Sequence, residues 1–472
     1  MFIFKYAQGE IAAIVNPPHG NVNAPSATGK VKGFPAGALL QAVLLNNFLH
    51  AGIKAAFRAG LVRMHGFRAC ARLARRRAPW PGGNPQATWK SRRGRRRRLA
   101  LAAAREGMEN MFGDISLSTQ MGIWGFIIGL ATGFVVHRTN FCAMGAVSDI
   151  VSFSDWRRMR AWILAMAVAM LGAQTLHLLS YVDLTRSIYL NGNLPLSLSG
   201  VIIGGLVFGF GMVLAGGCPG RNLMRVGNGD LKAMLVMFVL AWAANLSMKG
   251  ILAFPRLWVG GAVSLDLKSL GLPDQGLATI LGKLTGADGP ALHTVVMLAF
   301  AGALALFAFK DKSFRNSPRH IAAGIFLGLL VTAAWFITGY LGYDEFADQP
   351  VQITGLTFIA PAADALKYWM FWTGDTITFA IATVTGVVIG SFISSKLNRT
   401  FHLSTFVDTP DTVRNIVGAV LMGFGGILAL GCTFGQGITG MSTLAIGSII
   451  ATISIIAGGV AGVKYMERVL DI

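Results

Sequence analysis

The feature that most constrains this fold is a series of apolar runs, each about 20 residues long. A run of that length crosses a hydrocarbon core of about 30 Å as an α-helix. Inside lipid, a helix also satisfies the hydrogen bonds of its own backbone. Only 13% of the 472 residues are charged, against about 25% in soluble globular chains. The sequence therefore predicts an all-α polytopic membrane protein.

Hydropathy predicts about nine transmembrane helices, which we number span 1 to span 9. They cover approximately residues 121–147, 160–180, 198–218, 231–253, 291–309, 320–341, 375–395, 413–432 and 443–465. Lys and Arg gather after spans 1, 3, 5 and 7 and at the C-terminus. Because short cytoplasmic connections carry the excess of positive charge, these connections should face the cytoplasm, and span 1 should begin outside.

Residues 1–110 differ from the rest of the chain in composition. They hold 19 Lys/Arg and 3 Asp/Glu, whereas residues 111–472 hold 22 and 18. The segment fits a basic arm for anionic lipid or nucleic acid, a disordered low-complexity extension, or translated sequence ahead of a native start at Met108 or Met111. We favour the last, because the membrane pattern begins directly after Met111 and a basic segment outside contradicts the orientation rule. We therefore expect no nucleic-acid partner.

Two segments match each other at an offset of 214 residues. Gly204–Cys218 reads GGLVFGFGMVLAGGC and Gly418–Cys432 reads GAVLMGFGGILALGC, with eight of the fifteen positions identical. A weaker match joins GFIIGL at 125–130 to GIFLGL at 324–329. Glycine patterns of this kind are common in membrane helices, but a cysteine ending both long copies favours a true repeat.

The repeat relates span 1 to span 6 and span 3 to span 8. Since matched spans are five apart, the two copies should cross the membrane in opposite directions. This predicts an inverted-topology repeat, with one half at about 115–255 and the other at about 315–468. Secondary transporters commonly have this plan, with the binding site between the halves.

Each matched cysteine, Cys218 and Cys432, is followed within five residues by Pro or Gly, which end a helix. Non-helical backbone at membrane depth is tolerated only where protein covers it or a polar cavity opens. These segments should therefore re-enter and line a path. Asn222 and Gln436, each four residues after its cysteine, are candidate amide donors there. If both helices crossed fully, the two cysteines would lie at opposite faces, so a shared path requires that the chain turn back.

Span 1 contains a third break, HRTNFCAMG, which includes Arg138, Asn140 and Cys142. An arginine in an apolar segment should face a cavity or pair with a charge, and Asp149 is a candidate partner. Arg138 and Arg221 together would suit an anionic solute. Arg221 fits a cytoplasmic anchor equally well.

The three cysteines near these breaks have two interpretations. A free cysteine is usually a small buried hydrophobe. A thiol is also a weak, polarizable donor that suits a soft sulfur atom, and as a thiolate it can react. The sequence holds no zinc-type Cys spacing and no phosphate-binding GxxxxGK[ST] pattern. We therefore expect no catalytic residue, no metal site and no cofactor.

These motifs resemble the YeeE/YedE family, the sulfur-transport family of bacterial inner-membrane proteins. The resemblance rests on RTNFC at 138–142 with Gly145, on 204–218 and on GFGGILALGC at 423–432, and it covers about 115–468. It implies an hourglass-shaped inverted repeat with short re-entrant helices. It also implies uptake of thiosulfate or a closely related sulfur anion across the inner membrane.

The resemblance further implies that Cys142, Cys218 and Cys432 line a central path and pass the anion along through S–H···S contacts. It suggests a small cytoplasmic sulfur-carrier protein as a partner. We therefore expect a transporter and not an enzyme. The candidate substrate-binding residues are Cys142, Cys218, Cys432, Arg138, Asn140, Arg221, Asn222 and Gln436.

Two other functions stay open from the sequence. One is a membrane thiol enzyme that relays sulfur as a persulfide to a cytoplasmic carrier. The other is a channel for another small sulfur or selenium species. Transport of a metal ion would call for carboxylates or histidines beside the thiols, and Asp149, His137 and Asp230 are too scattered in sequence to supply them.

Overall fold

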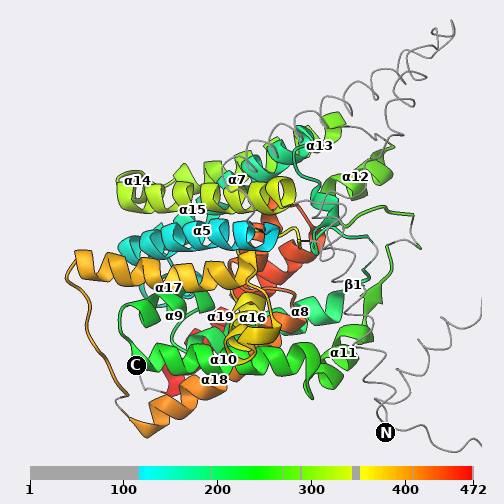
Figure 1. Cartoon of the computed structure of the whole chain (residues 1–472). Coiled ribbons are helices and arrows are strands. Elements are labelled where there is room, and N and C mark those ends of the chain that lie inside the picture. The colour runs from blue at the N-terminus through cyan, green and yellow to red at the C-terminus, as the bar shows by residue number, and fades with distance from the viewer. Residues whose placement is uncertain are drawn as a thin grey trace, which may run out of the picture. The chain divides into compact units, whose positions relative to one another are not determined.

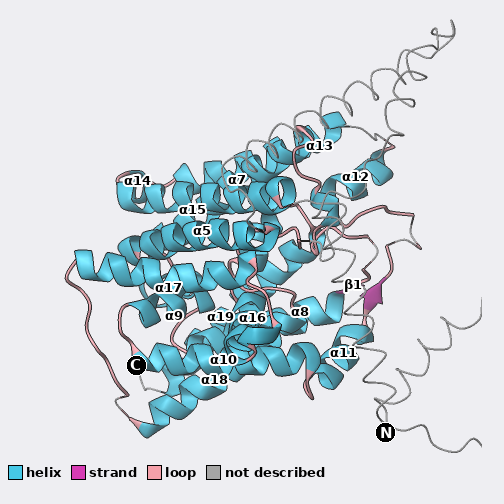
Figure 2. Ribbon diagram, viewed as in Figure 1, coloured by secondary structure: helices cyan, strands magenta, loops and turns pink. Residues whose placement is uncertain are grey.

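The computed structural model describes residues 116–469, except for 193, 268, 270, 287–289, 343–350 and 407. Residues 1–110 lie outside the described residues, so our interpretation of that segment stays a prediction. Helices dominate the described chain, and one short antiparallel pair of strands joins Leu196 to Leu265 (Figure 2).

The described elements follow one another in this order: α5 (Leu117–Thr139), α6 (Ala143–Phe153), α7 (Arg157–Leu178), the 3₁₀ helix η1 (Leu184–Arg186), β1 (Leu196–Ser197), α8 (Leu198–Leu214), α9 (Pro219–Gly227), α10 (Leu231–Lys249), α11 (Ala253–Ala262), β2 (Ser264–Leu265), α12 (Leu277–Thr285), α13 (Pro290–Phe309), α14 (Lys312–Arg315), α15 (Pro318–Phe336), the π-helical turn η2 (Ile337–Leu341), α16 (Ile359–Met370), the 3₁₀ helix η3 (Trp372–Gly374), α17 (Phe379–Leu397), α18 (Thr409–Leu428), the π-helical turn η4 (Gly435–Gly440) and α19 (Ile446–Val469).

Nine helical segments of the described chain are long and apolar enough to cross a membrane. This confirms the prediction of an all-α polytopic membrane protein. Seven of the nine begin and end within a few residues of the predicted bounds. Spans 1 and 3 differ, because their helical segments continue to Phe153 and Gly227. In both, a short helix, α6 or α9, follows a break in the chain.

The repeated helices α8 and α18 pack against each other in opposite directions. A Cβ built at Gly204 would lie 2.6 Å from the backbone nitrogen of Ala429, and one at Gly418 would lie 2.5 Å from that of Ala215. The end of α18 therefore lies beside the first half of α8, and the end of α8 lies beside the middle of α18, so the two helices run antiparallel. Because the same offset of 214 residues relates the two contacts, a twofold pseudosymmetry axis runs between these helices. This antiparallel pairing of α8 and α18 is the arrangement that the predicted inverted repeat requires.

The weaker match, between spans 1 and 6, marks a second pair of equivalent contacts. A Cβ at Gly129 of α5 would lie 2.2 Å from the carbonyl oxygen of Thr383 in α17. A Cβ at Gly328 of α15 would lie 2.9 Å from that of Ala165 in α7. α5 and α17 lie side by side (Figure 1). Close backbone approach of this kind is a main source of helix association in lipid.

The fifth span, which contains α13, stands outside the repeat. Only 22% of its most apolar stretch is buried, whereas at least 44% is buried in each of the other eight spans. It packs mainly on α7. Its position fits a connector that returns the chain across the membrane. With the predicted orientation, the first half begins outside and the second half then begins on the cytoplasmic side.

Substituting the two symmetry-related glycines should destabilise the protein to a similar extent. Gly204→Ala and Gly418→Ala each place a methyl group within contact distance of backbone, and overpacking of this kind costs about 1–3 kcal/mol. Thermal unfolding of the purified protein in detergent should show a lowered Tm for both.

The matched control is Gly302→Ala in α13, where an added Cβ meets nothing within 4 Å. Its Tm should stay unchanged or rise, because alanine is the better helix former. Wild-type Tm values for both Gly204→Ala and Gly418→Ala would contradict the close antiparallel contact.

Candidate functional site

The two matched helices end in the same kind of sharp turn. After α8, the Gly217 N–H donates to the carbonyl oxygen of Met212 at 2.9 Å. After α18, the Gly431 N–H donates to that of Gly426 at 2.8 Å. The residue before each of these amides has a positive φ, which completes the pattern known as a Schellman motif. Both helices thus end before their cysteines and the chain turns back, as a path shared by the two cysteines requires.

A cysteine begins the short segment that follows each break. Cys142 caps α6, where its sulfur accepts the Gly145 N–H at 3.3 Å. Cys432 accepts the Gly435 N–H, also at 3.3 Å, at the start of η4. Cys218 occupies the N-cap position of α9, followed by Pro219. Each thiol therefore sits at the positive end of a short helical segment.

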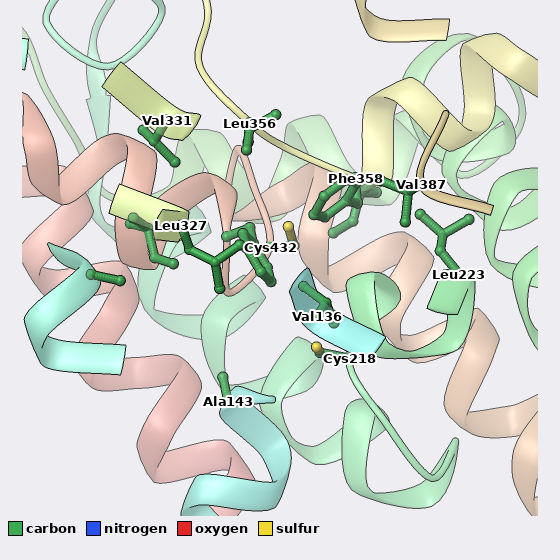
Figure 3. Close-up of a cluster of buried hydrophobic side chains, with 14 of the residues drawn as sticks. Val136, Ala143, Cys218, Leu223, Leu327, Val331, Leu356, Phe358, Val387 and Cys432 are labelled. Carbon is green, nitrogen blue, oxygen red and sulfur yellow. The ribbon is translucent and has the colours of Figure 1, made fainter. Parts of the chain in front are cut away.

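The structure brings the three cysteines into one buried cluster. Cys142 is 3% exposed, and Cys218 and Cys432 are fully buried. The thiols of Cys142 and Cys218 lie close enough to interact, and the Thr433 hydroxyl lies near Cys218. Figure 3 shows Cys218 and Cys432 in this cluster together with Val136. The cysteines do not lie at opposite faces.

The two turns meet at the pseudosymmetry axis. A Cβ at Gly220 would lie 3.1 Å from the ring of Phe434, and these two positions correspond at the offset of 214. The Phe434 ring also contacts Phe358 at 5.1 Å and Phe141 at 5.8 Å between centroids. Phe358 occupies the N-cap position of α16, as Cys142 does in α6. The second half therefore carries an aromatic ring where the first half carries a thiol.

Asn222 and Gln436 hold the turns in place. The Asn222 amide donates to the Gly217 carbonyl at 2.9 Å, and the Gln436 amide donates to the Ala429 carbonyl at 2.6 Å. Each thereby satisfies a carbonyl that the end of its helix leaves free. These donors point at backbone, and a role of the two residues toward a solute stays a prediction.

A cavity of about 720 Å³ lies on the side that we predict to be cytoplasmic. Arg138, Asn140 and Arg221, all predicted as binding residues, line it. Arg225 and Arg319 also line it, and so do His137, His402 and Asn398. The carboxylate of Asp230 at its wall pairs with Arg225 at 2.7 Å. The lining is therefore strongly cationic.

The predicted pairing of Arg138 with Asp149 is wrong. Asp149 pairs with Arg158 at 3.2 Å, because α6 carries it toward the start of α7. Arg138 instead donates to the side chain of Asn398. A neutral partner leaves the charge of the guanidinium uncompensated at the cavity wall.

Sequence reasoning missed several residues of this region. Arg225 lies one turn after Arg221 on α9, and that spacing could have indicated it. Arg319, in the first turn of α15, and Asn398, at the end of α17, are far away in sequence, and no local pattern indicates them. In the described part of the chain, no group of three or more His, Cys, Asp or Glu converges.

Removing one turn-holding amide should weaken the fold. Asn222→Leu keeps a similar volume but leaves the buried Gly217 carbonyl without its donor, which costs about 1–3 kcal/mol. The expected result is a lower Tm in detergent. Asn316→Leu, at the exposed end of α14, is the control and should behave as wild type. Equal Tm values for the two variants would argue against the proposal that the Asn222 side chain stabilises the turn after α8.

Comparison with known proteins agrees with this architecture. Residues 138–461 match the model of a family described as Sulphur transport. The thiosulfate transporter TsuA of Escherichia coli K12 is 26% identical over 346 residues, which are 66% of this chain and 86% of the relative. TsuA of Spirochaeta thermophila is 28% identical over 340 residues, 71% of this chain and 96% of the relative. The probable transporter YedE of Escherichia coli K12 is 26% identical over 202 residues, 42% of this chain and 44% of the relative. Because the family model matches more than half of it, this chain belongs to the Sulphur transport family.

Proposed function

We propose that this protein takes up thiosulfate, or a closely related sulfur anion, across the bacterial inner membrane. The observation that carries the proposal is the buried cluster of Cys142, Cys218 and Cys432 at the meeting point of two inverted halves. Inverted-repeat transporters bind their solutes at such an interface. The names of the two TsuA relatives supply the substrate.

The topology supports an order for the three thiols along the path. With the predicted orientation, α18 runs outward, so Cys432 follows an outer helix end. α5 and α8 run inward, so Cys142 and Cys218 follow inner ends. An anion arriving from outside would meet Cys432 first. It would then reach the neighbouring pair Cys218 and Cys142 and leave through the cationic cavity.

Each contact on this path has to be weak. A conducting path needs sites that release the solute as well as bind it. A neutral thiol is a weak donor and meets a terminal sulfur as a soft partner. Transport through such contacts changes no covalent bond of the anion, so the protein acts as a transporter and not as an enzyme.

The cavity gives the path a cationic cytoplasmic end. Arg138 and Arg221 would receive the anion there, since guanidinium groups bind oxyanions through two parallel hydrogen bonds. Asn140 also lines this cavity. A small cytoplasmic sulfur-carrier protein would collect the anion from this side.

The thiol path is tested by growth of a cysteine-requiring strain that lacks thiosulfate transport, with thiosulfate as the sole sulfur source. The wild-type gene should restore growth. Cys142→Ala, Cys218→Ala and Cys432→Ala should each fail, although all three variants reach the membrane. Cys70→Ala is the matched control, because Cys70 belongs to the N-terminal segment outside the described residues, and it should grow as wild type does.

Growth of all three path variants at the wild-type rate would refute the thiol path. Persulfide trapped on Cys218 during turnover would instead favour a thiol enzyme.

The cationic end is tested with Arg221→Gln. Loss of the guanidinium should raise the KM for thiosulfate uptake by about tenfold, since a hydrogen bond to a charged group contributes about 1.5–3 kcal/mol. Arg315→Gln, an exposed arginine on the same side that does not line the cavity, should leave the KM unchanged. Equal KM values for both variants would show that Arg221 is only an orienting anchor.

A further inference from the structure

Two buried hydroxyl groups near the cysteines make no hydrogen bond to a nitrogen or oxygen atom of the described chain. They belong to Tyr189, which is 5% exposed, and Thr433, which is 1% exposed. Leaving a buried hydroxyl unpaired costs about 1–3 kcal/mol, so such groups in a native fold call for an explanation. Neither residue belongs to the thiol path as described above.

Tyr189 reaches the region of Cys432 from the connection between α7 and α8. Its hydroxyl would lie 3.5 Å from a Cβ built at Gly435, and the Gly435 N–H is the donor to the Cys432 sulfur at 3.3 Å. The Thr357 hydroxyl would lie 2.7 Å from the same Cβ position. A side chain at 435 would therefore occupy the space that these two hydroxyls face.

The Tyr189 hydroxyl is held as a donor. Its ring packs edge-on against Trp335, with centroids 6.4 Å apart. Burial raises the pKa of the Tyr189 phenol. The group therefore keeps its proton at physiological pH and offers it to an acceptor.

Thr433 offers a second hydroxyl donor, which lies between the thiols. It directly follows Cys432 in the chain, and its hydroxyl lies beside the thiol of Cys218. Cys218 thus has the Thr433 hydroxyl next to its sulfur, and Cys432 has the Thr357 hydroxyl, while the Tyr189 hydroxyl faces the same space at Gly435. The thiols are soft groups suited to sulfur, whereas the hydroxyls are hard donors suited to oxygen. Contact of the thiols with a sulfur atom does not explain why hydroxyls lie beside them.

We propose that Tyr189 and Thr433 form oxygen-binding subsites, which hold the oxyanion end of the solute while Cys432 and Cys218 contact its sulfur end. The inference rests on the proposed function, because it assigns the second half of the same anion. A thiol is a poor donor to a hard oxygen, whereas a hydroxyl forms a short, strong hydrogen bond to a charged oxygen.

The subsites define the class of solute. A thiosulfate-like anion carries one terminal sulfur and several oxygens, and it satisfies both kinds of group at once. Hydrosulfide leaves the hydroxyls unpaired, and sulfate offers no soft atom to the thiols. Sites that contain buried polar groups discriminate strongly against a ligand that lacks the matching atom.

The test measures the KM and the maximal rate of radiolabelled thiosulfate uptake into vesicles, normalised to the protein present in the membrane. Tyr189→Phe and Thr433→Val remove one hydroxyl each and keep the shape of the side chain. Each should raise the KM by about tenfold or more, with the maximal rate largely retained. Thr433→Ser restores the hydroxyl and should restore the KM. Tyr181→Phe, an exposed tyrosine on the same side of the protein, is the control and should match wild type.

Wild-type KM values in both Tyr189→Phe and Thr433→Val would overturn the subsites while the wild-type protein still takes up thiosulfate. A raised KM in Thr433→Ser equal to that of Thr433→Val would also overturn them, because shape alone would then matter. No uptake by the wild-type protein would instead refute the proposed function. The two positions are independent, so a variant that does not reach the membrane leaves the other to decide.

Discussion

The close backbone contact between α8 and α18 is the constraint on which the rest of the structure depends. Glycines at equivalent positions let the two helices pack closely in opposite directions. Each helix ends four residues before its cysteine, at Leu214 or Leu428, and a sharp turn sends the chain back inward. The inverted arrangement therefore delivers two re-entrant turns to one axis. Without that contact, Cys218 and Cys432 would belong to opposite faces.

The environment of the thiols follows from this geometry. The turns expose backbone groups at membrane depth, and these are satisfied locally by Asn222, Gln436 and the helix-capping sulfurs. Protein covers the region completely, as irregular backbone in a membrane requires. The two ends of the path then differ in charge. The thiols are surrounded by apolar and hydroxyl side chains, whereas the cytoplasmic cavity gathers arginines. This difference in charge between the two ends of the path suits an anion that must be held weakly by the thiols and then released toward the cytoplasm.

Much of this fold could be predicted from the sequence, because long apolar runs and an eight-in-fifteen match are local signals. The breaks near Cys218 and Cys432 were predictable for the same reason, although the helices end four residues before these cysteines, at Leu214 and Leu428. The partner of Arg138 was not, since Asn398 lies 260 residues away and only the packing of α5 on α17 brings it near. Tyr189 was missed because it comes from a connection with no motif of its own. Its importance appears only when its unpaired hydroxyl is seen beside Cys432.

The central claim is that the anion touches the buried thiols as it passes. The most direct measurement is the rate at which a small, neutral alkylating reagent modifies Cys218 in the purified protein, followed by mass spectrometry. Thiosulfate should slow the modification of Cys218 in proportion to its occupancy of the site, whereas sulfate at the same ionic strength should not. An alkylation rate that saturating thiosulfate leaves unchanged would contradict the account.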